Sequence, residues 1–435
     1  MQRFFSALKN NKLLAHNIIL FVGALAVGGL NYLYYPVIGR MLPPATFGEV
    51  QTLVSLFLQL YVVFGVLSLL TVTLVTNNDN EVRRNKIIIE LERLSLFVSL
   101  VLLVVVWLAS GILQEFLHFT SGLPFVVLAL IVAITVPFTF RSSYLRGHKL
   151  FGLSSWSLIL GAGSKLGFSV VLVAAGFGTT GAILGIALAQ LVSFWFAAWQ
   201  AKRHGFSESL RSSFFAKPDL SLIRPELAYA GLVFVCTLVM TLLYSADIVI
   251  VKRLFEAHTA GLYGGIAAVA RIPFFLTASI PQVLMSSVKM THSEEKNRKI
   301  LRQSSVMMFV MGGASTAFFW LFPDWTVGLL MGQVYLPYAH LLPHLSLAVF
   351  IVSAVNLYVT YYLALRRWSI GLVAVGGAIA TVGFLMWQHA SPDEVVASLL
   401  SGSIITAGIL GLFMAYDMLI GKKNVTGEMG KGAKA

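Results

Sequence analysis

Long apolar runs recur through the whole chain, and they limit its fold more than any other feature. Each run has about 20 residues or more, the length that an α-helix needs to cross a hydrocarbon core about 30 Å thick. Only helices and closed barrels satisfy every backbone polar group in lipid, and these runs show helical length rather than strand alternation. The sequence therefore predicts an all-α polytopic membrane protein.

We expect twelve spans with short loops between them. Their predicted bounds are 15–38, 47–75, 93–113, 123–145, 153–176, 181–200, 228–251, 261–288, 303–323, 338–364, 369–387 and 396–420. These bounds predict an N-terminal lobe (1–200), a cytoplasmic inter-lobe loop (201–227), a C-terminal lobe (228–420) and a disordered basic tail (421–435).

The charge distribution supports this topology and excludes a soluble protein. Only 11% of the residues are charged, the mean hydropathy is +0.83, and soluble domains carry about 25% charge. Of the 31 Lys and Arg residues, 26 fall on the loops and termini of one side, three on the other side and two inside spans. The net charge of +13 is thus a topology signal and not a nucleic-acid surface. It predicts that both termini lie in the cytoplasm.

A short motif occurs twice, after the first and after the seventh span. Arg40 is followed by Thr six places later and by Gly eight places later, and Arg253 is followed by the same residues at the same spacing. Both copies lie between the first and second helix of a six-helix set. The repeat predicts two parallel halves related by an axis along the membrane normal.

Two basic residues lie deep inside predicted spans. At 1.5 Å per residue, Lys165 is about 18 Å and Arg271 about 15 Å from the start of its span. Each such charge costs about 2.5–3.5 kcal/mol. One lies in each half, so a shared cavity would place both on a bound anion such as phosphate. The alternative is a salt bridge with an acid in the membrane, but the sequence offers no obvious acid at that depth.

Three further charged residues are candidates for the site. Asp247, near the outer end of its span, either pairs with Lys252 or Arg253 or couples transport to a cation. Arg40 either lines the outer mouth of an anion pathway or anchors a helix end. Arg141, about one turn inside the inner surface, could meet an anionic head group. We predict no catalytic residue, no metal site and no resident cofactor, since paired carboxylates, cysteine motifs and nucleotide loops are missing from the sequence.

Polar and aromatic side chains near these cations complete the candidates. Asn31 and Gln59 face either polar partners or a cavity. Tyr32, Tyr34 and Tyr35 could stack against sugar rings, although an aromatic belt at the membrane interface is the more usual reading of such residues.

Several motifs resemble the oligosaccharide flippases of the polysaccharide transporter family. The first is Tyr-Pro-Val-Ile-Gly-Arg-Met-Leu-Pro-Pro-Ala-Thr-Phe-Gly-Glu at 35–49. The second is Arg-Ser-Ser-Tyr-Leu-Arg-Gly-His-Lys-Leu-Phe-Gly at 141–152. The third is Asp247 followed by Gly-Leu-Tyr at 261–263. The superfamily of these flippases also contains the lipid II flippase and multidrug/toxin exporters.

The resemblance implies two six-helix lobes around a central cationic cavity, and alternating access. It implies outward transport of an undecaprenyl-diphosphate-linked repeat unit of O-antigen, capsule or exopolysaccharide across the bacterial inner membrane. Lys165 and Arg271 correspond to the family's cavity cations by helix and depth. Polymerase and glycosyltransferases of the same pathway are the implied partners, no enzymatic activity is implied, and a proton or sodium gradient could drive transport.

Two alternatives stay open at this point. A cation-coupled multidrug exporter of the same superfamily would need acidic residues in its cavity. A membrane component of a polysaccharide synthase or polymerase complex would not need buried cations.

Overall fold

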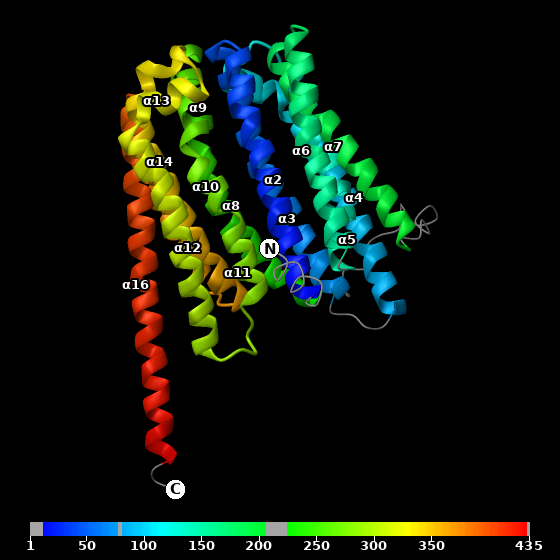
Figure 1. Cartoon of the computed structure of the whole chain (residues 1–435), viewed down its shortest axis with the longest axis vertical. Coiled ribbons are helices and arrows are strands. Elements are labelled where there is room, and N and C mark those ends of the chain that lie inside the picture. The colour runs from blue at the N-terminus through cyan, green and yellow to red at the C-terminus, as the bar shows by residue number, and fades with distance from the viewer. Residues whose placement is uncertain (1–11, 77–80, 149, 206–223, 433–435) are drawn as a thin grey trace, which may run out of the picture.

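The computed structural model describes residues 12–76, 81–148, 150–205 and 224–432. All regular secondary structure in these residues is helical (Figure 1). The N-terminal half contains α2 (Lys12–Met41), α3 (Pro44–Thr76), α4 (Glu81–Phe116), α5 (Leu123–Gly147), α6 (Phe151–Ala174) and α7 (Gly178–Arg203). The C-terminal half contains α8 (Arg224–Leu254), α9 (Ala257–Ala270), α10 (Ile272–Thr277), α11 (Ser279–Ser287), α12 (Glu294–Leu321), α13 (Pro323–Leu330), the 3-10 helix η3 (Gln333–Leu341), α14 (Leu342–Ala364), α15 (Ile370–Trp387) and α16 (Pro392–Gly432).

Eleven segments of the described chain are long and apolar enough to cross a membrane. The first of these segments is in α3. Helices α9 to α11 together form one segment, and η3 and α14 form another. The 30-residue helix α2 precedes them where the first span was expected. The predicted all-α polytopic class is therefore confirmed.

Proline divides the eighth span into three helices. Pro273 has no N–H to donate to the carbonyl four residues earlier, so the helix is interrupted between α9 and α10. Pro281 lies in the first turn of α11, just after the second interruption. Arg271 occupies the first break, because it follows the last residue of α9 and precedes the first residue of α10.

The two halves lie side by side, the N-terminal half in blue to green and the C-terminal half in green to red (Figure 1). Helix α3 packs against α8 and α9, and α2 packs against α9, α10 and α11. We call the end of the bundle where α2 passes into α3 the Arg40 end. There, one hydrophobic core takes residues from both halves, including Phe47, Tyr263 and Tyr335.

Towards the opposite end the buried residues form clusters that belong mainly to one half. One cluster lies in the C-terminal half around Val239 and Tyr362. Another lies mainly in the N-terminal half around Ile87 and Tyr144. The halves are thus joined most continuously at the Arg40 end.

The C-terminal segment differs from expectation. Helix α16 continues to Gly432, past the expected span end at 420 and through most of the segment expected to be disordered. A helix that already exists gains one hydrogen bond for each residue it adds, so it extends beyond its apolar part. The expected inter-lobe loop is bounded by the end of α7 and the start of α8, and its residues 206–223 lie outside the described residues.

Candidate functional site

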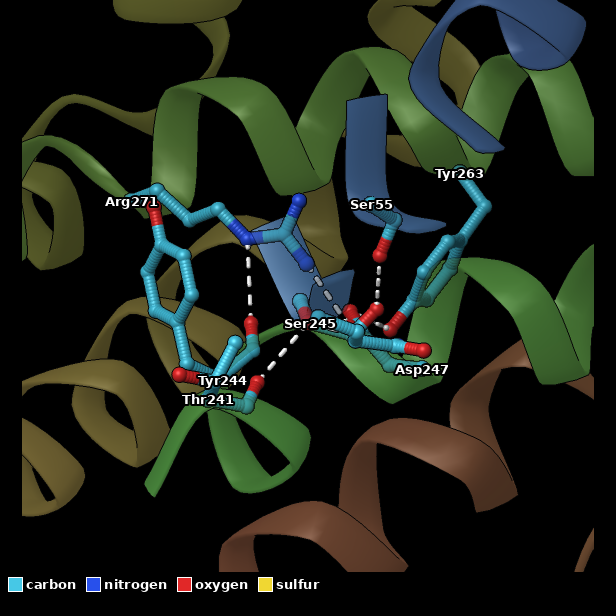
Figure 2. A network of polar contacts seen from close by, with 8 residues as sticks. Ser55, Thr241, Tyr244, Ser245, Asp247, Tyr263 and Arg271 are labelled. Atoms are coloured by element: carbon cyan, nitrogen blue, oxygen red, sulfur yellow. Dashed lines mark hydrogen bonds and ion pairs between the residues drawn. The ribbon is translucent and has the colours of Figure 1, made fainter. Parts of the chain in front are cut away.

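Arg271 is buried and paired with an acid. Its side chain is 7% exposed, and Nη2 donates to Asp247 Oδ1 at 2.7 Å (Figure 2). Its Nε donates to the Tyr244 carbonyl at 3.2 Å. Of the two alternatives for this cation, the structure thus shows the salt bridge, with an acid that the sequence had not singled out for it. Of the two alternatives for Asp247, the pairing with Lys252 or Arg253 is wrong.

The geometry of the α8–α9 hairpin explains this pairing. Asp247 lies about 10 Å before the end of α8, and Tyr263 lies about 9 Å after the start of α9, so the two are level in antiparallel neighbours. The Tyr263 hydroxyl donates to Asp247 Oδ2 at 2.9 Å. The long Arg271 side chain reaches back from the helix break to the other carboxylate oxygen (Figure 2). Both oxygens of Asp247 are thus engaged.

This network extends into the N-terminal half through α3. The Ser55 hydroxyl donates to the Ser245 carbonyl, two residues before Asp247 (Figure 2). Gln59 Nε2 donates to the Ser245 hydroxyl at 3.5 Å. The ion pair therefore lies beside the contact between the two halves, and Gln59 has a polar partner.

Lys165 has a different environment. It lies on α6, and its Nζ donates to Asn31 Oδ1 at 2.5 Å. The ammonium lies 4.5 Å from the centroid of the Tyr34 ring and 6.0 Å from that of Tyr35. Among the residues described, no acidic side chain lies within salt-bridge distance of it. An amide oxygen and aromatic faces stabilise a cation without neutralising its charge, so Lys165 can attract an anion.

Aromatic rings connect the two cations. Tyr35 lies 5.6 Å from Tyr34 in the same helix and 6.1 Å from Phe275 in the C-terminal half. Phe275 lies 6.5 Å from Tyr244, and the Arg271 guanidinium lies 5.0 Å from the Tyr244 ring. Tyr34 and Tyr35 are buried, so the belt interpretation is wrong for them. Both rings face the Lys165 ammonium and not the lipid interface.

Arg141 lies apart from this cluster. Its Nη2 forms an ion pair with Glu92 of α4, and its side chain is mostly buried. An anionic head group would have to displace Glu92 to reach it. The sequence showed the cation but not the partner, because α4 extends as a helix well beyond the expected span and brings Glu92 alongside α5.

Arg40 and Arg253 each contact the opposite half at the Arg40 end. The guanidinium of Arg40 donates to the carbonyls of Gly328, Leu329 and Leu330, at the end of α13. Such carbonyls have no partner inside a helix and carry partial negative charge. Arg253 Nη1 lies 2.9 Å from His118 Nε2, in the segment between α4 and α5. In each case the partner lies between the third and fourth spans of the other half.

The glycines of the repeated motif also meet at the Arg40 end. A Cβ on Gly48 would lie 2.8 Å from the Gly261 Cα, and a Cβ on Gly261 would lie 1.9 Å from the Pro44 carbonyl oxygen. Only glycine allows such an approach of two backbones. The structure thus brings the two copies of the motif together.

Comparison with known proteins identifies the family. Residues 13–285 match the family described as "Polysaccharide biosynthesis protein". The chain belongs to this polysaccharide biosynthesis family. The resemblance inferred from the motifs is confirmed. A search of curated proteins gives no match.

Solved structures show that this family member has the fold of MOP-superfamily transporters. One is an inward-facing multidrug resistance MATE family transporter, with a TM-score of 0.75 and 14% identity over 92% of this chain and 99% of that one. Another is the lipid II flippase MurJ in an inward closed conformation, with a TM-score of 0.70 and 12% identity over 93% and 87% of the two chains. A third is a MOP superfamily transporter from Pyrococcus furiosus, with a TM-score of 0.64 and 15% identity over 93% and 96%; its binding pocket is described as having reverse polarity. At these identities the likeness establishes the fold alone.

Proposed function

We propose that this protein is a flippase that moves an undecaprenyl-diphosphate-linked oligosaccharide outward across the bacterial inner membrane by alternating access. The observation that carries the proposal is the arrangement of Lys165 and Arg271. Each half contributes one cation within the membrane, and a line of aromatic rings connects them. The polysaccharide biosynthesis family supports a glycan carrier.

The proposed orientation follows from the distribution of basic residues. Both termini lie in the cytoplasm, and the Arg40 end faces outward. The shared core, the paired glycines and the two arginine contacts close this end. The diphosphate enters from the opposite end and binds Lys165 first, because that ammonium has no acid to displace. The polyprenyl chain stays in lipid while the sugars pass between the halves.

Arg271 changes partners when the diphosphate arrives. A phosphate can engage a guanidinium through two hydrogen bonds and therefore competes with Asp247. The displaced carboxylate keeps only Tyr263 as a donor from the contacts described above. Since an unpaired buried charge is costly, Asp247 takes up a proton or sodium ion at this step. Substrate binding is thereby linked to cation uptake by Asp247.

Arg141 and Arg40 serve the ends of the pathway in this proposal. Arg141 exchanges Glu92 for the head group near the cytoplasmic side. Arg40 releases the carbonyls of α13 when the outer end opens. The exported glycan then passes to a polymerase, and glycosyltransferases of the same pathway supply the substrate.

The test is export in a strain that lacks the gene. Lys165→Ala and Arg271→Ala should each lower glycan export by about tenfold or more, because a charge-assisted hydrogen bond is worth about 1.5–3 kcal/mol. Exposed Lys299→Ala and Arg302→Ala are matched controls and should export normally. The level of folded protein is measured for every variant. Normal export by both membrane variants would refute the proposal.

A cation-coupled multidrug exporter is the second candidate, and Asp247 is the observation that favours it. Such a protein would keep the Asp247 carboxylate for a cationic drug and would not need Lys165. Drug susceptibility that rises in Asp247→Asn but not in Lys165→Ala would support it. If the protein had only a structural role in a synthase complex, export would need the protein but would be insensitive to substitution of Lys165 and Arg271.

A further inference from the structure

A pocket of about 300 Å³ lies at the Arg40 end, away from the two membrane cations. Five hydroxyl side chains line it: Thr46, Thr120, Ser121, Thr179 and Thr180. Glu49, His118 and Phe177 also line it. The transport step described above uses none of these side chains.

Glu49 gives the pocket a buried acceptor. The residue is 7% exposed. Its Oε2 accepts a hydrogen bond from the Thr179 hydroxyl at 2.7 Å. Among the residues that the structure describes, its Oε1 has only long hydrogen-bond contacts, 3.4 Å to the Thr120 amide and 3.5 Å to the Thr120 hydroxyl. Since good hydrogen bonds to oxygen are near 2.7–3.0 Å, Oε1 can accept a further hydroxyl.

Phe177 gives the pocket an apolar surface. It is 58% exposed, at the turn that precedes α7. An exposed phenyl ring beside hydroxyls and a carboxylate suits a ligand with one apolar face and several hydroxyl groups. A sugar ring has this chemistry, because its C–H groups gather on one face and its hydroxyls point around the rim.

The surrounding charges disfavour ionic ligands. Arg253 contacts His118 at the edge of the pocket, and the buried Lys252 ammonium lies 5.1 Å from the Phe119 ring, next to Thr120. These cations oppose a metal ion, and the described residues contain no group of three or more His, Cys, Asp or Glu that could hold one. The Glu49 carboxylate opposes an anion. A neutral, polyhydroxylated ligand is repelled neither by these cations nor by the carboxylate.

We propose that this pocket is an exit subsite that binds one sugar ring of the exported glycan. The proposal rests on the proposed function. Ala257 of α9 completes a wall otherwise formed by the N-terminal half, so the pocket is complete only while the halves are together at this end. It therefore holds the glycan after the outer end has closed behind it, before a partner removes it.

Saturation-transfer NMR tests the subsite directly. The probes are oligosaccharides from partial hydrolysis of the organism's own surface polysaccharide, added to the protein in nanodiscs. Wild-type protein should transfer saturation to sugar ring protons. Phe177→Ala should lower this signal to background, and Glu49→Gln should weaken it. Phe322→Ala removes a ring that is 50% exposed, just before α13 of the C-terminal half; it is the matched control and should bind as wild type does.

The outcomes separate this proposal from the proposed function. No signal with wild-type protein, or an equal signal with Phe177→Ala, overturns the subsite. Lys165→Ala should lower export by about tenfold or more while it leaves the NMR signal unchanged. Normal export by both Lys165→Ala and Arg271→Ala, together with a Phe177-dependent signal, would refute the transport proposal and leave the sugar-binding pocket standing. Because Phe177 is exposed, its substitution tests binding without disturbing the core.

Discussion

Removal of Asp247 should destabilise the protein chiefly by stranding Arg271. In Asp247→Ala the guanidinium loses its 2.7 Å partner, and the Tyr263 hydroxyl loses its 2.9 Å acceptor. Arg271 keeps the Tyr244 carbonyl, which carries no net charge. A buried pair that loses one partner costs about 3–5 kcal/mol, and we expect a loss of this size.

The double variant Asp247→Ala/Arg271→Met should recover part of this stability. It removes both charges, and replacing a buried pair with apolar side chains is often close to neutral. The loss in the double variant should therefore be smaller than the sum of the single losses by about 2–4 kcal/mol. Tyr263 stays without an acceptor in both backgrounds, so it does not contribute to this difference.

These losses form a double-mutant cycle. Equilibrium unfolding in mixed micelles measures the free energy of unfolding of the wild type, of the two single variants and of the double variant. The exposed pair Arg298–Glu294, at 2.5 Å with side chains 55% and 69% exposed, is the matched control, and its loss should cost about 0.5 kcal/mol or less. Additive single losses, within about 0.5 kcal/mol, would refute the argument that each buried charge requires the other for stability.

Three further substitutions test contacts elsewhere. Gly261→Ala should abolish export and shift spin-label distances across the Arg40 end, because the new Cβ would lie 1.9 Å from a backbone oxygen. Gly264→Ala is the control and should be tolerated, because the nearest atom to its Cβ would be 3.5 Å away. Arg40→Gln should widen the same distance distribution, because three α13 carbonyls lose their donor; an unchanged distribution would count against a closing role. Glu92→Gln should lower thermal stability by weakening the pair with Arg141, and a double variant that also carries Arg141→Met should be less destabilised than the two single losses predict.

The fold could be predicted from the sequence because run length alone dictates a membrane helix. The repeated motif also pointed correctly to equivalent loops, since its two glycines meet in space. The extent of α16 could not be predicted this way, because hydropathy marks where lipid ends and not where the backbone hydrogen bonds end.

The candidate site was predicted only in part. Burial of Lys165 and Arg271 follows from their depth in apolar runs, but a partner for each depends on how neighbouring helices face one another. Matching depths along the α8–α9 hairpin would have placed Asp247 level with Tyr263. Arg271 lies eight residues further along, about 12 Å in a continuous helix, so its contact with Asp247 could not have been placed in the same way. Comparable reasoning could not have placed Tyr34 over Lys165, because that contact joins α2 to α6, which are far apart in sequence.

The paired glycines have a consequence for the proposed alternating access, in which the halves part in every cycle. Where Gly48 meets Gly261, backbone lies directly on backbone, while the side chains of the shared core and of Arg40 and Arg253 make the surrounding contacts. Separation of these two glycines exposes little apolar surface, and the peptide groups that it exposes can be hydrated at once. The paired glycines therefore add little to the cost of parting the halves, and that cost falls on the shared core and the arginine contacts around them.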